Sequence, residues 1–172
     1  DVYACRQTGF AMLAETNPQE VMDLSPVAHL AAIEGKVPFI NFFDGFRTSH
    51  EIQKIEKWDY ADLKEMCNMD AVKAFREHAL NPEHPAMRGS HENGDVFFQH
   101  REACNSVYEA LPAVVKKYMG KINEKLGTNY DLFNYYGAED ADRVIIAMGS
   151  ICDVAEEVIA VSYTHLTLPT KL

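Results

Sequence analysis

Residues 37–43 (VPFINFF) form a short, almost unbroken apolar run, and this run constrains the fold more than any other feature. A run of this length, rich in β-branched and aromatic residues, predicts a strand buried on both faces. Asp44 and Gly45 end the run with a turn signal, and polar side chains fill the loop that follows. Open α/β sheets bind ligands outside the carboxyl ends of their strands, so this loop is a candidate site. The alternative is that Asp44 and Ser49 only cap a turn.

A second apolar run precedes the first, and a helical pattern joins the two. Residues 8–14 predict another buried strand. Thr16 or Asn17 can then cap a helix that has Pro18 at its first position, and Gly35 can end it. Strand, helix and strand with tight loops predict one βαβ unit, with parallel strands and a right-handed crossover.

Helical patterns dominate the middle of the chain. Two short helices are expected, one capped by Asp59 and the other by Asp70, with Asn68 as a rival cap. A longer helical pattern covers residues 97–126, and Gly127 is a natural end for it.

Two prolines fall inside predicted helices. Pro26 is expected to start or kink a turn, and Pro112 is expected to break or restart its helix. Each proline removes a backbone donor that a continuous helix would use.

A domain boundary is predicted near Tyr136, so that residues 1–135 belong to one α/β domain. Residues 136–160 then supply the first strand and helix of a second domain, with the strand at residues 144–148. Residues 161–172 show no helical period and resemble translated sequencing-adapter read-through, so they are expected to be a non-native tail. The alternative for this tail is a genuine β-extension.

Composition excludes several kinds of partner. The chain of 172 residues carries a formal net charge of −10, which argues against nucleic acid and against an anionic membrane surface. No apolar run approaches the roughly 20 residues of a membrane span. The chain starts with neither a methionine nor a signal peptide, so it is expected to begin in mid-domain. A cytoplasmic location is a separate expectation.

Cysteine and histidine spacing gives little support for a metal site. His84 and His91 lie in one loop beside acidic residues, but nothing in the sequence fixes a ligand geometry. The cysteines form no CxxC motif and are expected to be reduced core thiols. They are Cys5, Cys67, Cys104 and Cys152.

Five segments of the chain closely resemble the pyruvate:ferredoxin (flavodoxin) oxidoreductase family. The likeness covers residues 1 to about 160 without an obvious gap. Its longest run is VAHLAAIEGKVPFINFFDGFRTSHEIQKIE, at residues 27–56. The other segments are residues 4–14, ALNPEHPAMRG at 79–89, FFQHREACN at 97–105 and YYGAEDADRVIIAMGS at 135–150.

The resemblance implies a fold and an activity. The fold implied for residues 1–135 is the C-terminal part of a parallel-sheet α/β domain, the transketolase pyrimidine-type domain that binds thiamine diphosphate. Residues 136–160 would begin the transketolase C-terminal-like domain. Enzymes of this family are large homodimers that convert pyruvate and coenzyme A to acetyl-CoA and carbon dioxide. They use thiamine diphosphate, Mg²⁺ and [4Fe-4S] clusters, and they pass electrons to ferredoxin or flavodoxin.

The resemblance also implies that the main chemical groups lie outside this chain. The family's activating glutamate and its pyruvate-binding threonine and arginine lie upstream of the position of Asp1. The diphosphate and magnesium site and the cluster cysteines lie downstream. A fragment without these groups is expected to be inactive by itself and to need the other domains of the same polypeptide.

The candidate cofactor-binding residues are those of the loop after residues 37–43, and they are Asp44, Arg47, Thr48, Ser49 and His50. Arg47 could bind a carboxylate or phosphate, and the other side chains offer hydrogen bonds. Together they could form a wall of the substrate or cofactor pocket, or they could stabilise a domain or subunit interface. No catalytic or metal-binding residue is assigned.

Two other functions remain open at this stage. The enzyme could act on another 2-oxoacid, because substrate choice depends on residues outside the chain. Alternatively, the chain could be a stand-alone interaction or assembly module built on a transketolase-like half-domain.

Overall fold

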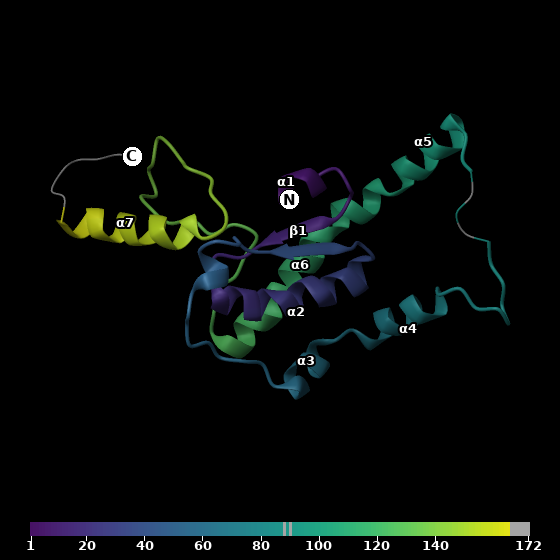
Figure 1. Ribbon diagram of the computed structural model, residues 1–172, viewed down its shortest axis with the longest axis horizontal. Coiled ribbons are helices and arrows are strands. Elements are labelled where there is room, and N and C mark those ends of the chain that lie inside the picture. The colour runs from purple at the N-terminus through teal and green to yellow at the C-terminus, as the bar shows by residue number, and fades with distance from the viewer. Residues whose placement is uncertain (88, 90, 166–172) are drawn as a thin grey trace.

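A computed structural model describes residues 1–87, 89 and 91–165 (Figure 1). Its centre is a two-stranded parallel sheet of β1 (Ala11–Ala14) and β2 (Phe39–Phe42). The register pairs Ala11 with Phe39 and Ala14 with Phe42. Helix α2 (Pro18–Gly35) joins the strands. The predicted α/β class and the parallel βαβ unit are therefore confirmed.

Local side-chain chemistry starts helix α2. Asn17 is the N-cap, and its side-chain oxygen accepts a hydrogen bond from the Glu20 backbone N–H at 3.0 Å. The Glu20 carboxylate accepts one from the backbone N–H of Thr16, the residue before the cap, at 2.7 Å. At the other end α2 stops at Gly35 as predicted, and Lys36, with φ 57°, follows it in the left-handed conformation.

Helix α6 (Asn105–Leu126) packs against α2, and together they cover one face of the sheet (Figure 1). The buried side chains between them include Val27 and Ile122, at 0% and 1% exposure. The core also takes in the following side chains: Leu24, Leu30, Ala31, Val37, Met66, Leu111, Val115, Tyr118 and Met119.

Both helices continue through their prolines. Pro26 lies inside α2 and Pro112 inside α6, so the predicted interruption at Pro112 is wrong. Burial of the residues around Pro112, such as Leu111 and Val115, offsets the lost backbone hydrogen bond. Gly127, with φ 71°, ends α6 as predicted.

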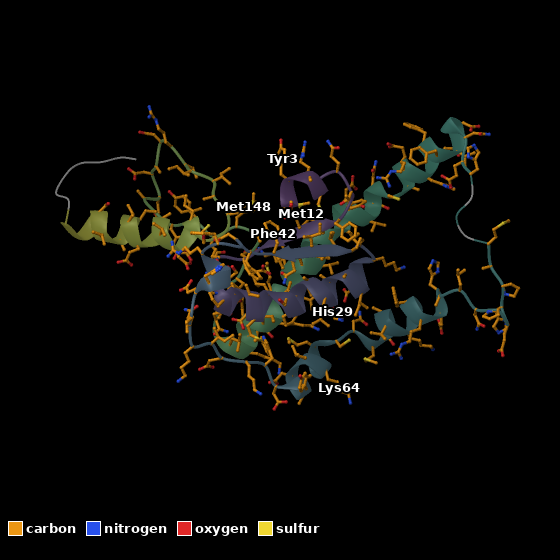
Figure 2. The ribbon with its side chains drawn as sticks, viewed as in Figure 1. Tyr3, Met12, His29, Phe42, Lys64 and Met148 are labelled. Carbon is orange, nitrogen blue, oxygen red and sulfur yellow. The ribbon has the colours of Figure 1, made fainter. Side chains whose placement is uncertain are left out.

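The sheet is covered by helices on only one face. Ala11, Leu13 and Phe39 pack against the helical core. Met12 and Phe42 lie on the opposite face and are half-buried (Figure 2). The expectation that residues 37–43 are buried on both faces is therefore wrong for the described residues, since the α2–α6 layer lies on one side of the sheet only.

Short helices follow the sheet. A 3₁₀ turn, η1, spans Thr48–His50, and Asp59 caps α3 (Tyr60–Met66) as predicted. Asn68, not Asp70, caps α4 (Met69–Glu77), because its side-chain oxygen accepts a hydrogen bond from the Ala71 backbone N–H at 3.1 Å.

Helix α5 (Gly94–Ala103) comes next among the named helices, and Cys104 alone separates it from α6 (Figure 1). The chain begins with the short helix α1 (Val2–Cys5). All four cysteines are free and partly buried, and one of them, Cys67, packs against the core. No described helix is both long and apolar enough to cross a membrane.

The region after Tyr136 departs most from the sequence prediction. Residues 144–148 form no strand, and Ile145 and Ile146 are 89% and 86% exposed. Their apolar pattern fits a sheet, but no described strand lies beside them to supply backbone hydrogen bonds. Helix α7 (Ile151–His165) does follow Gly149 and Ser150 as predicted.

The proposed tail falls partly within α7. The helix includes residues 161–165, so the expectation that residue 161 onward is non-helical is wrong there. Residues 166–172 lie outside the described residues.

Candidate functional site

The candidate site lies where the two strands end. The strands are parallel, so the loops after Ala14 and Phe42 leave the same edge of the sheet. The Thr48 hydroxyl, which belongs to a residue only 4% exposed, donates a hydrogen bond to the Thr16 backbone oxygen at 3.2 Å. This contact joins the two loops.

Asp44 organises the second loop through its carboxylate. Its Oδ1 atom accepts hydrogen bonds from the backbone N–H groups of Phe46, Arg47 and Thr48 at 3.2, 2.6 and 3.3 Å. A hydrogen bond from the Ser150 side chain, followed by that from the Arg47 backbone, lowers the pKa of Asp44 to about 2. Asp44 is therefore an ionised capping residue, as the turn-capping alternative predicted.

Ser49 and His50 are adjacent and exposed. Ser49 Oγ lies 2.9 Å from His50 Nδ1, but the serine hydroxyl donates to the Gly45 backbone oxygen at 2.5 Å. The hydroxyl proton is thus engaged with a carbonyl, which gives no support for serine activation by His50. The His50 ring lies against that of Phe46, with centroids 6.1 Å apart.

Arg47 is exposed. The five predicted residues therefore lie together, but they divide into two groups. Asp44 and Thr48 hold the loop in shape, and Arg47, Ser49 and His50 face outward. The exposed side chains of the second group can contact another molecule or domain, although the Ser49 hydroxyl already donates to Gly45.

Glu15, directly after β1, was not predicted from the sequence. It is fully buried at 0% exposure, and neither carboxylate oxygen has a hydrogen-bond partner of good geometry among the described residues. Burial, and then the Glu20 charge, raise the pKa of Glu15 to about 8, although its own backbone N–H acts in the opposite direction. The available sequence signal was a glutamate that ends an apolar strand immediately before a helix cap.

Comparison with known proteins identifies the family. Residues 1–120 match the family described as "Pyruvate flavodoxin/ferredoxin oxidoreductase, thiamine diP-bdg". The chain belongs to this pyruvate flavodoxin/ferredoxin oxidoreductase family. The resemblance in the sequence is thereby confirmed, and so is the assignment of the partial fold to a thiamine-diphosphate-binding domain.

Several relatives of the oxidoreductase family align over 159 residues, 92% of this chain. A pyruvate-flavodoxin oxidoreductase from Enterobacter agglomerans is 60% identical, and a pyruvate:ferredoxin oxidoreductase from Moorella thermoacetica is 54% identical. A pyruvate dehydrogenase [NADP(+)] from Cryptosporidium parvum is 48% identical. The chain spans about 14% of the length of the first two relatives and 8% of the third.

The family description implies thiamine diphosphate, and the lining of one depression among the described residues can be compared with that cofactor. This depression, with a volume of about 210 Å³, is lined by four carboxylates and two lysines, a charge balance that opposes a diphosphate. Its lining residues are Asp23, Glu56, Lys57, Trp58, Asp59, Asp62, Lys125 and Leu126.

Metal ligands are also not brought together. Among residues 1–87, 89 and 91–165, no three His, Cys, Asp or Glu side chains converge on a point where they could hold an ion. The structure therefore gives no support for a site at His84 and His91, and the four cysteines form no cluster site within that part of the chain.

Proposed function

We propose that this chain serves as part of the thiamine-diphosphate-binding domain of an enzyme that oxidatively decarboxylates pyruvate. The enzyme would use coenzyme A, release acetyl-CoA and carbon dioxide, and pass electrons to ferredoxin or flavodoxin. The observation that carries this proposal is 60% identity over 159 residues to a pyruvate-flavodoxin oxidoreductase. Identity at this level extends through the sheet, the core helices and the strand-end loops.

The residues described here would act as a scaffold in that enzyme. Thiamine diphosphate supplies an electron sink for decarboxylation, and iron–sulfur clusters transfer single electrons. Since the chain spans about 14% of such a relative, the groups that hold these cofactors are proposed to lie mainly in other parts of the enzyme. We therefore expect the chain alone to be inactive, and we propose that it works with further domains in a cytoplasmic homodimer.

Two domains are proposed within the chain. Residues 1–135 would complete the pyrimidine-binding domain, since they include the sheet and all of the buried core. Residues 136–160 would begin the next domain. In support, the exposed residues 144–148 have a strand-like sequence without a neighbouring strand among the described residues.

The strand-end loop would lie at a domain or subunit interface, with contact to the cofactor pocket as the alternative. The interface role is favoured because Asp44 and Thr48 are occupied with internal hydrogen bonds while Phe46 is 90% exposed. Arg47→Ala in a complete relative separates the two roles. Dissociation of the dimer would support an interface, whereas a raised pyruvate or cofactor constant in an intact dimer would support the pocket.

A chimera tests the proposed activity directly. The aligned 159-residue segment of the Enterobacter agglomerans relative is replaced by the matching segment of this chain, and pyruvate-dependent reduction of a viologen dye is measured. We expect turnover within about tenfold of the parent enzyme. A matched chimera with the Moorella thermoacetica segment controls for the effect of exchanging the segment.

Specific outcomes would contradict the proposal. A chimera that is dimeric and carries its cofactors, but is inactive while the control chimera is active, would overturn it. Activity with another 2-oxoacid in place of pyruvate would replace the proposed substrate. Turnover by residues 1–172 alone would overturn the scaffold role.

A further inference from the structure

The start of helix α5 places an asparagine directly before a glycine. Asn93 is the N-cap of α5, and Gly94 is the first residue of that helix. No other asparagine in the chain precedes a glycine. Figure 1 shows α5 at one end of the molecule, away from the sheet. Both residues are exposed, so water and hydroxide reach them directly from solvent.

The Asn93 side chain is not engaged as a helix cap. It makes no capping hydrogen bond to the described residues of α5. By contrast, Asn17 and Asn68 each accept a hydrogen bond from a backbone N–H of the helix that they precede, at 3.0 and 3.1 Å. A side-chain amide without such a bond can rotate between its staggered positions. The Asn93 Cγ carbon can therefore approach the backbone nitrogen of the next residue.

Gly94 offers an uncrowded nitrogen to that carbon. It has no side chain, and a Cβ atom built on it would meet no described atom within 4 Å. Its N–H is also one of the first four of a helix, which have no acceptor within the helix. The Gly94 N–H is therefore open to hydroxide, which can remove its proton.

We propose that Asn93 is a site of spontaneous deamidation to aspartate and isoaspartate, and that the isoaspartate form opens the first turn of α5. After loss of its proton to hydroxide, the Gly94 nitrogen forms a bond to Asn93 Cγ. The bond from Cγ to Nδ2 breaks, and the amide nitrogen leaves as ammonia with a proton taken from water. Water then opens the resulting succinimide ring at either carbonyl carbon. The reaction consumes only water.

The two products differ in their effect on α5. Aspartate adds a negative charge at the N-terminus of the helix, where the helix dipole favours it, and it can make the capping bond that Asn93 does not make. Isoaspartate carries the main chain through the former side chain, which inserts one extra carbon. The Asn93 carbonyl that accepts a hydrogen bond from the Phe97 N–H at 2.9 Å then leaves the main chain.

Peptide mapping by mass spectrometry tests the site on the full chain after incubation at mildly alkaline pH. We expect the mass gain of deamidation to accumulate at Asn93 several-fold faster than at any other asparagine. Isoaspartate is identified by its methylation with an isoaspartyl methyltransferase. Gly94→Ala should slow the reaction several-fold, because a Cβ atom crowds the nitrogen. Gly120→Ala, at another helical glycine with open space around it, should leave the rate at Asn93 unchanged.

The comparison with Asn105 can overturn the proposal. Asn105 precedes a serine, and its side chain donates a hydrogen bond to the Glu102 carboxylate at 3.2 Å, so it should react slowly. Conversion at Asn105 as fast as at Asn93 would contradict the proposed site. An unchanged rate in Gly94→Ala would contradict it as well, and that variant is expected to fold because its position is exposed and helical.

Hydrogen exchange of the separated products tests the effect on α5. The Phe97 amide should lose protection in the isoaspartate product and keep it in the aspartate product. Loss of protection in both products, or in neither, would overturn the proposed opening of the first turn.

Discussion

Glu34, near the end of α2, connects three helices through one carboxylate. Its oxygens accept hydrogen bonds from Lys117 Nζ at 2.7 and 2.9 Å and from the Tyr118 hydroxyl at 2.5 Å, both on α6. Asn68, the cap of α4, donates a further bond at 3.0 Å. The Lys117 bond, followed by the Tyr118 bond, lowers the pKa of Glu34 to about 2. The carboxylate is therefore ionised and well satisfied in the folded chain.

Glu34→Gln is expected to lower the free energy of unfolding by about 1–3 kcal/mol at pH 7, because hydrogen bonds to a charged group are lost and the Tyr118 hydroxyl is left poorly paired. Since the folded pKa lies below the unfolded value of 4.5, the contribution is present above pH 4.5 and disappears as pH falls toward 2. In urea denaturation, the difference in the free energy of unfolding between variant and wild type should be smaller near pH 3 than at pH 7.

An exposed ion pair provides the control for Glu34. Lys73 and Glu77 lie 3.8 Å apart with side chains 75% and 67% exposed, so Glu77→Gln should change stability by less than about 0.5 kcal/mol. Equal losses in Glu34→Gln and Glu77→Gln would show that the Glu34 network does not stabilise the fold.

Residue-scale features were predictable where they depend on near neighbours in sequence. The caps Asn17 and Asp59 could be predicted because each bonds a backbone group within three residues. Asn68 was recognised only as a rival to Asp70, although its bond is equally local. The burial of Glu15 could not be predicted, since it depends on elements that fold over the strand end.

Helices α2 and α6 approach closely where Gly35 meets Leu111. A Cβ atom built on Gly35 would lie 2.6 Å from Leu111 Cδ1, and Leu111 is only 7% exposed. By contrast, Gly120, in the middle of α6, has open space where a Cβ would be. The two glycines thus occur in helices for different reasons.

These two positions should respond to alanine in opposite directions. Gly35→Ala is expected to destabilise the chain by about 1–3 kcal/mol, because Leu111 must leave its packed position. Gly120→Ala should stabilise it by about 0.5–1 kcal/mol through helix propensity alone. Thermal unfolding of both variants measures the contrast. Stabilisation by Gly35→Ala would mean that α2 and α6 leave room for a Cβ atom between Gly35 and Leu111.

At the scale of elements, α2 and the parallel strands were predictable from apolar periodicity and end signals. The interruption expected at Pro112 was wrong because the α2–α6 contact holds the helix together around it. The strand expected at residues 144–148 was wrong for the opposite reason, since a strand needs a partner that the described residues do not provide. Apolar pattern alone could not distinguish these cases.

The molecule exposes apolar surface well away from its core. Val144, Ile145, Ile146 and Met148 are 63–89% exposed in one continuous segment. A short, uncharged and β-prone segment of this kind favours pairing between chains. The chain in isolation is therefore expected to self-associate.

Ile146→Lys should reduce that self-association without changing the unfolding temperature, because the side chain is 86% exposed. Light scattering against concentration measures the effect. Ile52→Lys is the matched control, since Ile52 is also fully exposed but stands among polar residues, and it should have a smaller effect. If both substitutions reduce self-association equally, the added positive charge, and not the loss of an apolar side chain in residues 144–148, would be the cause.

At the scale of the whole molecule, the sequence allowed the family and fold class to be predicted, and both are confirmed. The candidate loop was also located correctly at the carboxyl edge of the sheet, because strand direction follows from the βαβ order. The roles of Arg47, Ser49 and His50 stay predictions. They depend on which surface meets this edge, and one chain's sequence does not define that surface.

The pairing of α2 with α6 has a consequence for synthesis on the ribosome. The β1–α2–β2 unit is complete at Phe42, but the helix that covers its core begins at Asn105. At about 5–20 residues per second, residues 43–104 take roughly 3 to 12 seconds to translate. During that interval the apolar side of α2 has no α6 to cover it. We therefore expect a chaperone to bind this unit on the nascent chain.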